Sequence, residues 1–110
     1  MIRVVNKRSH RPRPGETTVY VGRPSPLGNR WSSKDSRVPG TTTVSSRDEA
    51  VDRFEAWLRA GGADEPAVRR ELDRIATLAA RGDVALECWC APARCHAGVI
   101  AAIIHEDYEI

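Results

Sequence analysis

The sequence predicts a small single-domain α/β fold with about three strands and three helices, in the order β-β-α-α-β-α, with at least two of the strands parallel. Its 110 residues are the length of one domain, and 41% apolar with 29% charged residues is typical of a water-soluble globular chain. Two segments with apolar residues at helical spacing lie between short β-branched and apolar runs. We therefore expect residues 1–110 to form one domain, with the basic segment 1–15 flexible in part.

The first part of the chain predicts two strands and a long loop. Ile2–Val5 is a short apolar run and Thr17–Gly22 is β-branched and aromatic, so both favour strands. The prolines of His10–Gly15 indicate a turn between them. Arg23–Pro39 shows no periodic pattern and predicts a long loop, and long loops in compact domains are often functional.

Two helices are expected next. Ser46 and Glu49 form the S-x-x-E pattern of a capping box, in which the hydroxyl and the carboxylate each satisfy a free backbone N–H. A helix is expected over residues 47–60, ended by Gly61-Gly62, and a second from near Asp64 to Gly82. Their apolar stripes are Val51, Phe54, Trp57 and Leu58 in the first, and Val68, Leu72, Ile75 and Ala79 in the second.

The C-terminal part predicts a buried strand and a last helix. Val84–Cys90 is mostly apolar on both faces, as in a central strand covered on both sides. Ala91–Arg94 is a short loop, and a helix is expected from Cys95 to about Glu106. Strand, two helices and strand form a crossover, which makes the Thr17–Gly22 and Val84–Cys90 strands parallel. The loops 22–31 and 90–96 then meet at the carboxyl edge of the sheet, where open α/β sheets bind ligands.

These two loops carry a resemblance to a known family. Tyr20–Asn29 (YVGRPSPLGN), and Cys88–Pro92 (CWCAP) with Cys95-His96, resemble the domain of unknown function numbered 4326, found in bacteria and their phages. Val5–Arg8 and Ser46–Leu58 are also similar to that family's pattern, so the resemblance covers nearly the whole chain. It implies a small intracellular α/β domain and supplies no reaction.

The chain departs from the family's pattern at two places. Arg30-Trp31 follow Gly28-Asn29, where the family usually has Pro-Phe. Gly98 stands two places after the histidine, where the family usually has an acidic residue. If that acid is catalytic in the family, this chain lacks it, whereas a ligand-binding role survives the change more easily.

The loop after the Thr17–Gly22 strand carries candidate ligand-binding residues. Arg23 offers a two-pronged donor for phosphate or carboxylate, and the amide of Asn29 suits a base or ribose edge. Gly28 permits close backbone approach, and Ser25 adds a hydroxyl that is a nucleophile only beside a base such as His96. Trp31 is a candidate for stacking on a base or a partner. The alternative is a rigid turn in which these residues serve the chain's own structure.

Three cysteines and a histidine fall within nine residues. His96 is the candidate general acid/base, and Cys95 or Cys90 the candidate nucleophile; the helix N-terminus is expected to lower the pKa of Cys95. A zinc site of Cys88, Cys90, Cys95 and His96 is an alternative, although C-x-C-x4-C-H is not a common zinc pattern. Core thiols beside a helix-capping histidine are the third reading.

Two tryptophans are expected to pack in the core. Trp57 falls on the apolar stripe of its helix. Trp89 points away from Cys88 and Cys90 on its strand, since successive side chains of a strand alternate between faces.

The charge is unevenly divided. Residues 1–47 carry ten Lys and Arg and two acids, a net of +8, whereas residues 48–110 carry a net of −6. We expect a cytoplasmic protein that binds a nucleotide-like or other anionic small molecule at loops 22–31 and 90–96, and that as an enzyme would be a hydrolase or transferase. The alternative is a small nucleic-acid- or protein-binding module with zinc as a structural cofactor; a third reading is an inhibitor of a host enzyme. The sequence shows neither a secretory signal nor an apolar run long enough to span a membrane.

Overall fold

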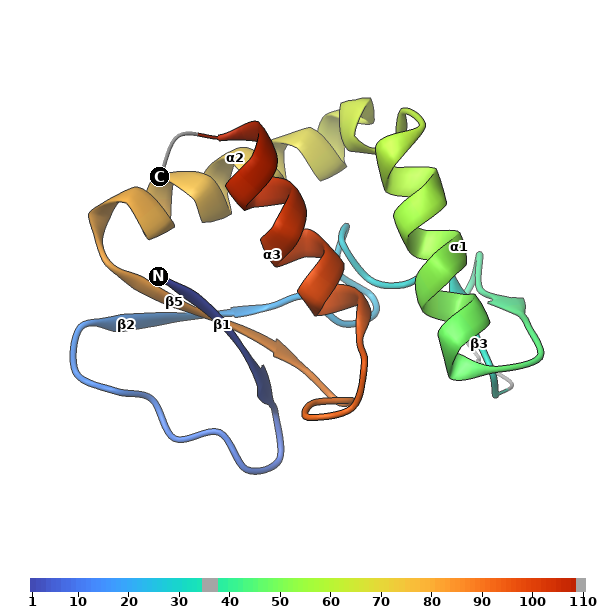
Figure 1. Ribbon diagram of the computed structural model, residues 1–110, viewed down its shortest axis with the longest axis horizontal. Helices are drawn as coiled ribbons and strands as arrows, with labels where there is room; N and C mark the ends of the chain where they lie inside the picture. The colour runs from blue at the N-terminus through green and yellow to red at the C-terminus, as the bar shows by residue number, and fades with distance from the viewer. Residues whose placement is uncertain (35–37, 109–110) are drawn as a thin grey trace.

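A parallel sheet of order β1-β5-β2 organises the computed structural model, which describes residues 1–34 and 38–108 (Figure 1). Its strands are β1 (Ile2–Asn6), β2 (Glu16–Tyr20) and β5 (Asp83–Cys88). Val4 and Val19 on the outer strands both pair with Leu86 of the central strand. The predicted fold class, the parallel pairing and the central position of the last strand are confirmed.

Three α-helices complete the domain, as the sequence predicts. They are α1 (Arg47–Arg59), α2 (Pro66–Arg81) and α3 (His96–Asp107), with a short 3₁₀ turn η1 (Gly62–Asp64) after α1. Ser46 caps α1, since its Oγ accepts a hydrogen bond of 3.0 Å from the Glu49 N–H. The Glu49 carboxylate accepts from the N–H of Ser45, one residue earlier than a standard capping box has it. Gly61, with φ +124°, makes the turn that ends α1.

The two faces of the sheet are covered differently. Val19, Val84 and Leu86 belong to the main core, and α2 and α3 pack on the strands. β5 lies between β1 and β2, so the connection of residues 7–15 that joins these two strands has to cross β5. It does so on the face opposite the helices. His10 of this connection contacts Thr18 and Arg3, and Figure 1 shows the connection below the sheet with the helices above it. The expected turn at His10–Gly15 is thus part of a crossover between parallel strands.

The prediction that Trp89 packs in the core is wrong. Trp89 is 51% exposed, whereas Cys88 beside it is fully buried. The alternation of the strand explains the difference: Cys88 faces the helices, and Trp89 lies on the other side, where the cover is a single loop segment. Trp57 is partly buried against the core, as expected.

The long loop contains a feature that the sequence did not predict. Within the expected loop Arg23–Pro39, which is described except at 35–37, Trp31–Ser32 forms β3. It pairs in parallel with β4 (Thr42–Thr43), and β3 packs on α1. This small pair fixes the loop against the first helix. No helix in the described part of the chain is long and apolar enough to cross a membrane.

Candidate functional site

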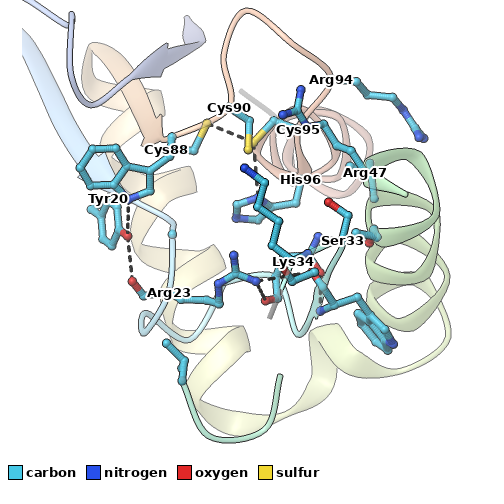
Figure 2. A pocket seen from close by; sticks show the side chains of 18 residues that line it. Tyr20, Arg23, Ser33, Lys34, Arg47, Cys88, Cys90, Arg94, Cys95 and His96 are labelled. Carbon is cyan, nitrogen blue, oxygen red and sulfur yellow. Dashed lines mark hydrogen bonds between the residues drawn. The ribbon is translucent and has the colours of Figure 1, made fainter. Parts of the chain in front are cut away.

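A cavity of about 450 Å³ opens at the carboxyl ends of β2 and β5 (Figure 2). The structure therefore brings together the two loops that the sequence places at one edge of the sheet. Candidate residues of both loops share its wall, and the first turn of α1 adds further side chains. The residues named by the sequence that line it are Arg23, Asn29, Trp31, Cys88, Cys90, Cys95 and His96; Tyr20, Lys34, Arg47, Trp89 and Arg94 line it too.

The cavity wall is strongly cationic. Arg23, Lys34, Arg47 and Arg94 line it, and among the described residues no aspartate or glutamate does. Arg94 is neutralised by Asp48 and Asp52, with a shortest distance of 2.7 Å to the Asp52 carboxylate. Among the residues that the structure describes, no carboxylate pairs with the other three cations.

The remaining cations differ in how they are held. Arg23 donates to the backbone carbonyls of Asn29, at 3.1 Å, and Trp31, which fix the side chain and leave its charge uncompensated. Lys34 and Arg47 are exposed, and neither has a carboxylate partner within residues 1–34 and 38–108. Figure 2 shows both side chains beside the cavity, from the β2–α1 segment and from α1. Three positive charges that lack a carboxylate partner in the described part of the chain favour an anion here.

Two helix N-termini add to this potential. Arg47 and Ala50 of the first turn of α1, and Cys95 and His96 at the start of α3, line the same cavity. The N-terminus of a helix carries partial positive charge and unpaired N–H groups. Cys95 is the N-cap of α3, but its side chain makes no capping hydrogen bond.

Asn29 holds the loop in place. Its side chain is buried, its Nδ2 donates to the Ala50 carbonyl at 3.1 Å, and its Oδ1 accepts from the Trp31 N–H at 3.0 Å. Both ends of the amide are thus engaged by backbone groups. The side chain that the sequence suggested for reading a base or ribose edge is a positioning residue in this structure.

The glycines of the motif serve close packing within the chain. A Cβ on Gly22 would come within 2.4 Å of the Tyr20 hydroxyl, and one on Gly28 within 2.9 Å of Arg23 Cα. Gly28 and Ser25 lie in a neighbouring groove rather than in the cavity lining. Ser25 Oγ is buried and has no hydrogen-bond partner among the described residues.

Trp31 is half-buried, and one of its neighbours is another tryptophan. Its ring lies 6.3 Å from that of Trp57, and the Arg30 guanidinium lies over Trp57 at 4.2 Å. Trp31 therefore contributes an aromatic surface to the cavity while being fixed from behind by α1.

His96 is buried and neutral. Its Nε2 lies 2.7 Å from the Val21 carbonyl, which only accepts hydrogen bonds, so Nε2 carries the proton. Its Nδ1 then carries no proton and lies 3.4 Å from Cys95 Sγ, whose single hydrogen is donated to Cys88. Burial lowers the pKa of His96. Nε2 is engaged by Val21 and Nδ1 faces Cys95, so the structure forms no pair between His96 and Ser25.

The three thiols form one hydrogen-bonded cluster, drawn at the top of Figure 2. Cys95 Sγ donates to Cys88 Sγ at 3.0 Å. Hydrogen bonds from the Cys90 and Cys95 thiols, and from the backbone N–H groups of Cys90 and Ala91, hold the pKa of Cys88 well below its usual value. The donated proton raises the pKa of Cys95 above its usual value. The expectation that the helix N-terminus lowers the pKa of Cys95 is wrong, because the neighbouring sulfur keeps its proton in place.

The same geometry bears on a metal site. Among the described residues, no three or more His, Cys, Asp and Glu side chains are placed to hold a metal ion. Cys88 and Cys95 are engaged with each other, and the protonated Nε2 of His96 faces a carbonyl. The zinc alternative at Cys88, Cys90, Cys95 and His96 stays a prediction that this arrangement does not strengthen.

Several cavity residues were not singled out in the sequence. In the sequence, Lys34, Arg47 and Arg94 contribute only to the overall charge, and Tyr20 is only one member of a motif. Arg47 had a usable signal, since it directly follows the Ser46 cap at the start of a helix. Lys34 and Arg94 had none beyond their position in a loop.

Comparison with known proteins agrees with the motifs. No curated protein and no solved structure gives a match to the chain. A family match extends over residues 4–106, from within β1 to the last turn of α3, and so includes the cavity residues. The chain therefore belongs to the family described as "Domain of unknown function (DUF4326)".

Proposed function

We propose that this protein binds a nucleotide-like or other phosphorylated small molecule in the cavity between loops 22–31 and 90–96. The observation that carries the proposal is the lining of the cavity, in which Arg23, Lys34 and Arg47 are cationic and have no carboxylate partner within residues 1–34 and 38–108. Proteins bind phosphate through guanidinium and ammonium groups and through the N–H groups of helix N-termini.

The rest of the wall supports a ligand with an aromatic part. A cavity of about 450 Å³ lies in the range of small-molecule sites. Trp31 contributes aromatic surface to the cavity, and its ring is held against that of Trp57. Anionic and aromatic requirements together describe a nucleotide better than inorganic phosphate.

For a hydrolase or transferase, the candidate reacting groups are Cys90, Cys95 and His96. Cys90 is the only thiol of the described chain that is not buried, and its pKa is raised because its S–H donates to Cys88. His96 would act on a reaction in the cavity through the Cys95 thiol, since its Nδ1 faces that sulfur. Incubation with nucleotides followed by chromatography of the products tests the enzyme role separately from binding.

The binding test is isothermal titration against phosphate, pyrophosphate and a panel of nucleoside mono- and diphosphates. Arg47→Ala should weaken the best ligand by roughly 10- to 100-fold, the range of a hydrogen bond to a charged group. Arg53→Ala is the matched control, because Arg53 is an exposed residue of the same helix that does not line the cavity. No binding across the panel, or equal affinities for Arg47→Ala and Arg53→Ala, would refute the proposal.

A further inference from the structure

The cavity continues onto a basic, aromatic surface on the face of the sheet opposite the helices. Trp89 belongs to both: it lines the cavity, and it is 51% exposed. Apart from Met1, it is the only large apolar side chain exposed in the described part of the chain. An exposed tryptophan at the rim of a cationic cavity requires a reason.

The ring of Trp89 is held in a fixed position. Its Nε1 donates to the Tyr20 hydroxyl at 3.1 Å, and that hydroxyl donates to the Arg23 carbonyl at 2.7 Å. The Arg8 guanidinium lies over the ring, 5.7 Å from its centre. The exposed ring is thus oriented by groups of three other segments, which makes it a ready stacking surface with a cation beside it.

From Trp89 a row of cations leads away from the cavity. Arg8, Arg11 and Arg13 are exposed and lie on the connection that crosses the sheet between β1 and β2. None of the three guanidinium groups has a carboxylate partner among the described residues, whereas the side chains of Arg3 and Lys7 are paired with Glu16 and Glu87. Arg11 and Arg13 line a second groove together with Ala91 and Pro92, of the same loop that carries Cys90 and Arg94 into the cavity.

These features match what single-stranded nucleic acid requires. Proteins that bind it combine a basic path for the phosphates with aromatic side chains on which bases stack. A free nucleotide would need only the cavity, and would leave Trp89 half exposed and the Arg8–Arg13 row unused. We propose that the ligand is the end of a single-stranded nucleic acid: its last nucleotide enters the cavity, the next base stacks on Trp89, and the following phosphates lie along Arg8, Arg11 and Arg13.

This inference rests on the proposed function of the cavity, and the two fail in different ways. The probes are a fluorescein-labelled oligothymidylate, an oligouridylate and the two matching mononucleotides, with affinities measured by anisotropy and by competition over a salt series. We expect the oligonucleotides to bind more tightly than the mononucleotides and to be displaced by them. Mononucleotide binding with no gain for the oligonucleotides would overturn the inference and leave the proposed function standing. Oligonucleotide binding that mononucleotides never displace would count against both.

Two variants locate the path. Trp89→Ala should weaken oligonucleotide binding by roughly 5- to 100-fold, the range of one base–aromatic stack, and should change mononucleotide binding far less. The double variant Arg11→Glu, Arg13→Glu should make the salt dependence shallower by about 1.4 in log–log slope, because up to two phosphate contacts are lost. The matched control is Arg70→Glu, Arg81→Glu, since both are exposed on α2. Equal losses in the two double variants would overturn the inference.

A last comparison separates nucleic acid from other polyanions. Vesicles containing phosphatidylserine offer the same negative charge without bases. Tighter binding to oligonucleotides than to vesicles, lost with Trp89→Ala, supports the inference. Binding to vesicles as tight as to oligonucleotides, and unaffected by Trp89→Ala, would overturn it.

Discussion

The side chain of Asn29 should stabilise the cavity loop rather than contact a ligand. Its amide joins the Ala50 carbonyl of α1 to the Trp31 N–H of β3, at 3.1 and 3.0 Å. Asn29→Ala removes both hydrogen bonds and leaves a small void at a position that is only 8% exposed. Asn29→Asp keeps the acceptor for Trp31 and places a carboxylate oxygen against the Ala50 carbonyl.

The cost follows from the two lost contacts. A net 0.5–1.5 kcal/mol for each hydrogen bond gives about 1–3 kcal/mol for Asn29→Ala. Asn29→Asp should cost more at neutral pH, because a buried charge then faces a carbonyl oxygen. Its deficit should shrink in acid, where the new carboxyl gains a proton and donates to that oxygen.

Urea unfolding followed by circular dichroism measures these effects. With a slope of about 1.5 kcal/mol per molar urea, a loss of about 2 kcal/mol lowers the midpoint by about 1.3 M. Ser33→Ala, at an exposed position of the same segment, is the control and should leave the midpoint unchanged. The reasoning is refuted if both Asn29 variants unfold at the wild-type midpoint, or if Asn29→Asp loses no more at neutral pH than in acid.

Three further predictions concern the same region. Burial lowers the pKa of His96 below its usual value of 6.5, so the neutral ring contributes its full stabilisation above that pH and loses it as the pH falls. In His96→Gln, the unfolding free energy should therefore decline less between about pH 7 and 5 than in the wild type. A decline as large as that of the wild type contradicts the assignment. In the native protein iodoacetamide should add to Cys90 first, slowly at neutral pH because its thiol pKa is raised, and peptide mass spectrometry showing another cysteine labelled as fast would contradict this. Gly22→Ala should lose about 1–3 kcal/mol, since its Cβ would meet the Tyr20 hydroxyl at 2.4 Å, whereas Gly98→Ala has open space and should gain up to about 1 kcal/mol; equal melting temperatures for the two would refute the packing argument.

Much of the fold was predictable because local signals agreed with one another. The Ser46 cap, the glycine at Gly61 and the apolar stripes predict the ends of α1 and α2 to within a few residues. The segment Val84–Cys90, apolar except at Glu87, indicated a central strand, and the crossover rule then placed both loops at one edge. Periodicity alone does not say which face of a sheet the helices cover. Trp89 was therefore assigned to the right side of its strand and the wrong environment.

The position of the site could be predicted from the sequence, but the roles of its residues could not. Sequence spacing brought Arg23 and His96 to one edge, but it gave no hydrogen-bond partners. Those partners decide the roles: Asn29 is engaged by two backbone groups, His96 by Val21, and Cys95 by Cys88. The cations Lys34 and Arg47 come from segments whose position depends on the β3–β4 pair and on the packing of β3 against α1. Two-residue strands leave no periodic signal in a sequence.

The structure also explains why the two departures from the family's pattern leave the cavity intact. Gly98 lines a separate groove beside Ala91 and Pro92, and a Cβ at this position would meet nothing within 4 Å. An acid there would lie near the N-terminus of α3 without facing the cavity, so its absence removes no group from the wall. At the other departure, the aromatic ring is kept as Trp31, and Arg30 stacks on Trp57 and pairs with Glu65 at 3.2 Å. That substitution adds a link between the loop and the helices behind it. Since neither change alters the side chains of Arg23, Arg47 or the three thiols, we expect the anion binding proposed above to be common to members with the usual pattern, and a member carrying Pro-Phe and the acid should show the same ligand preference in the same titration.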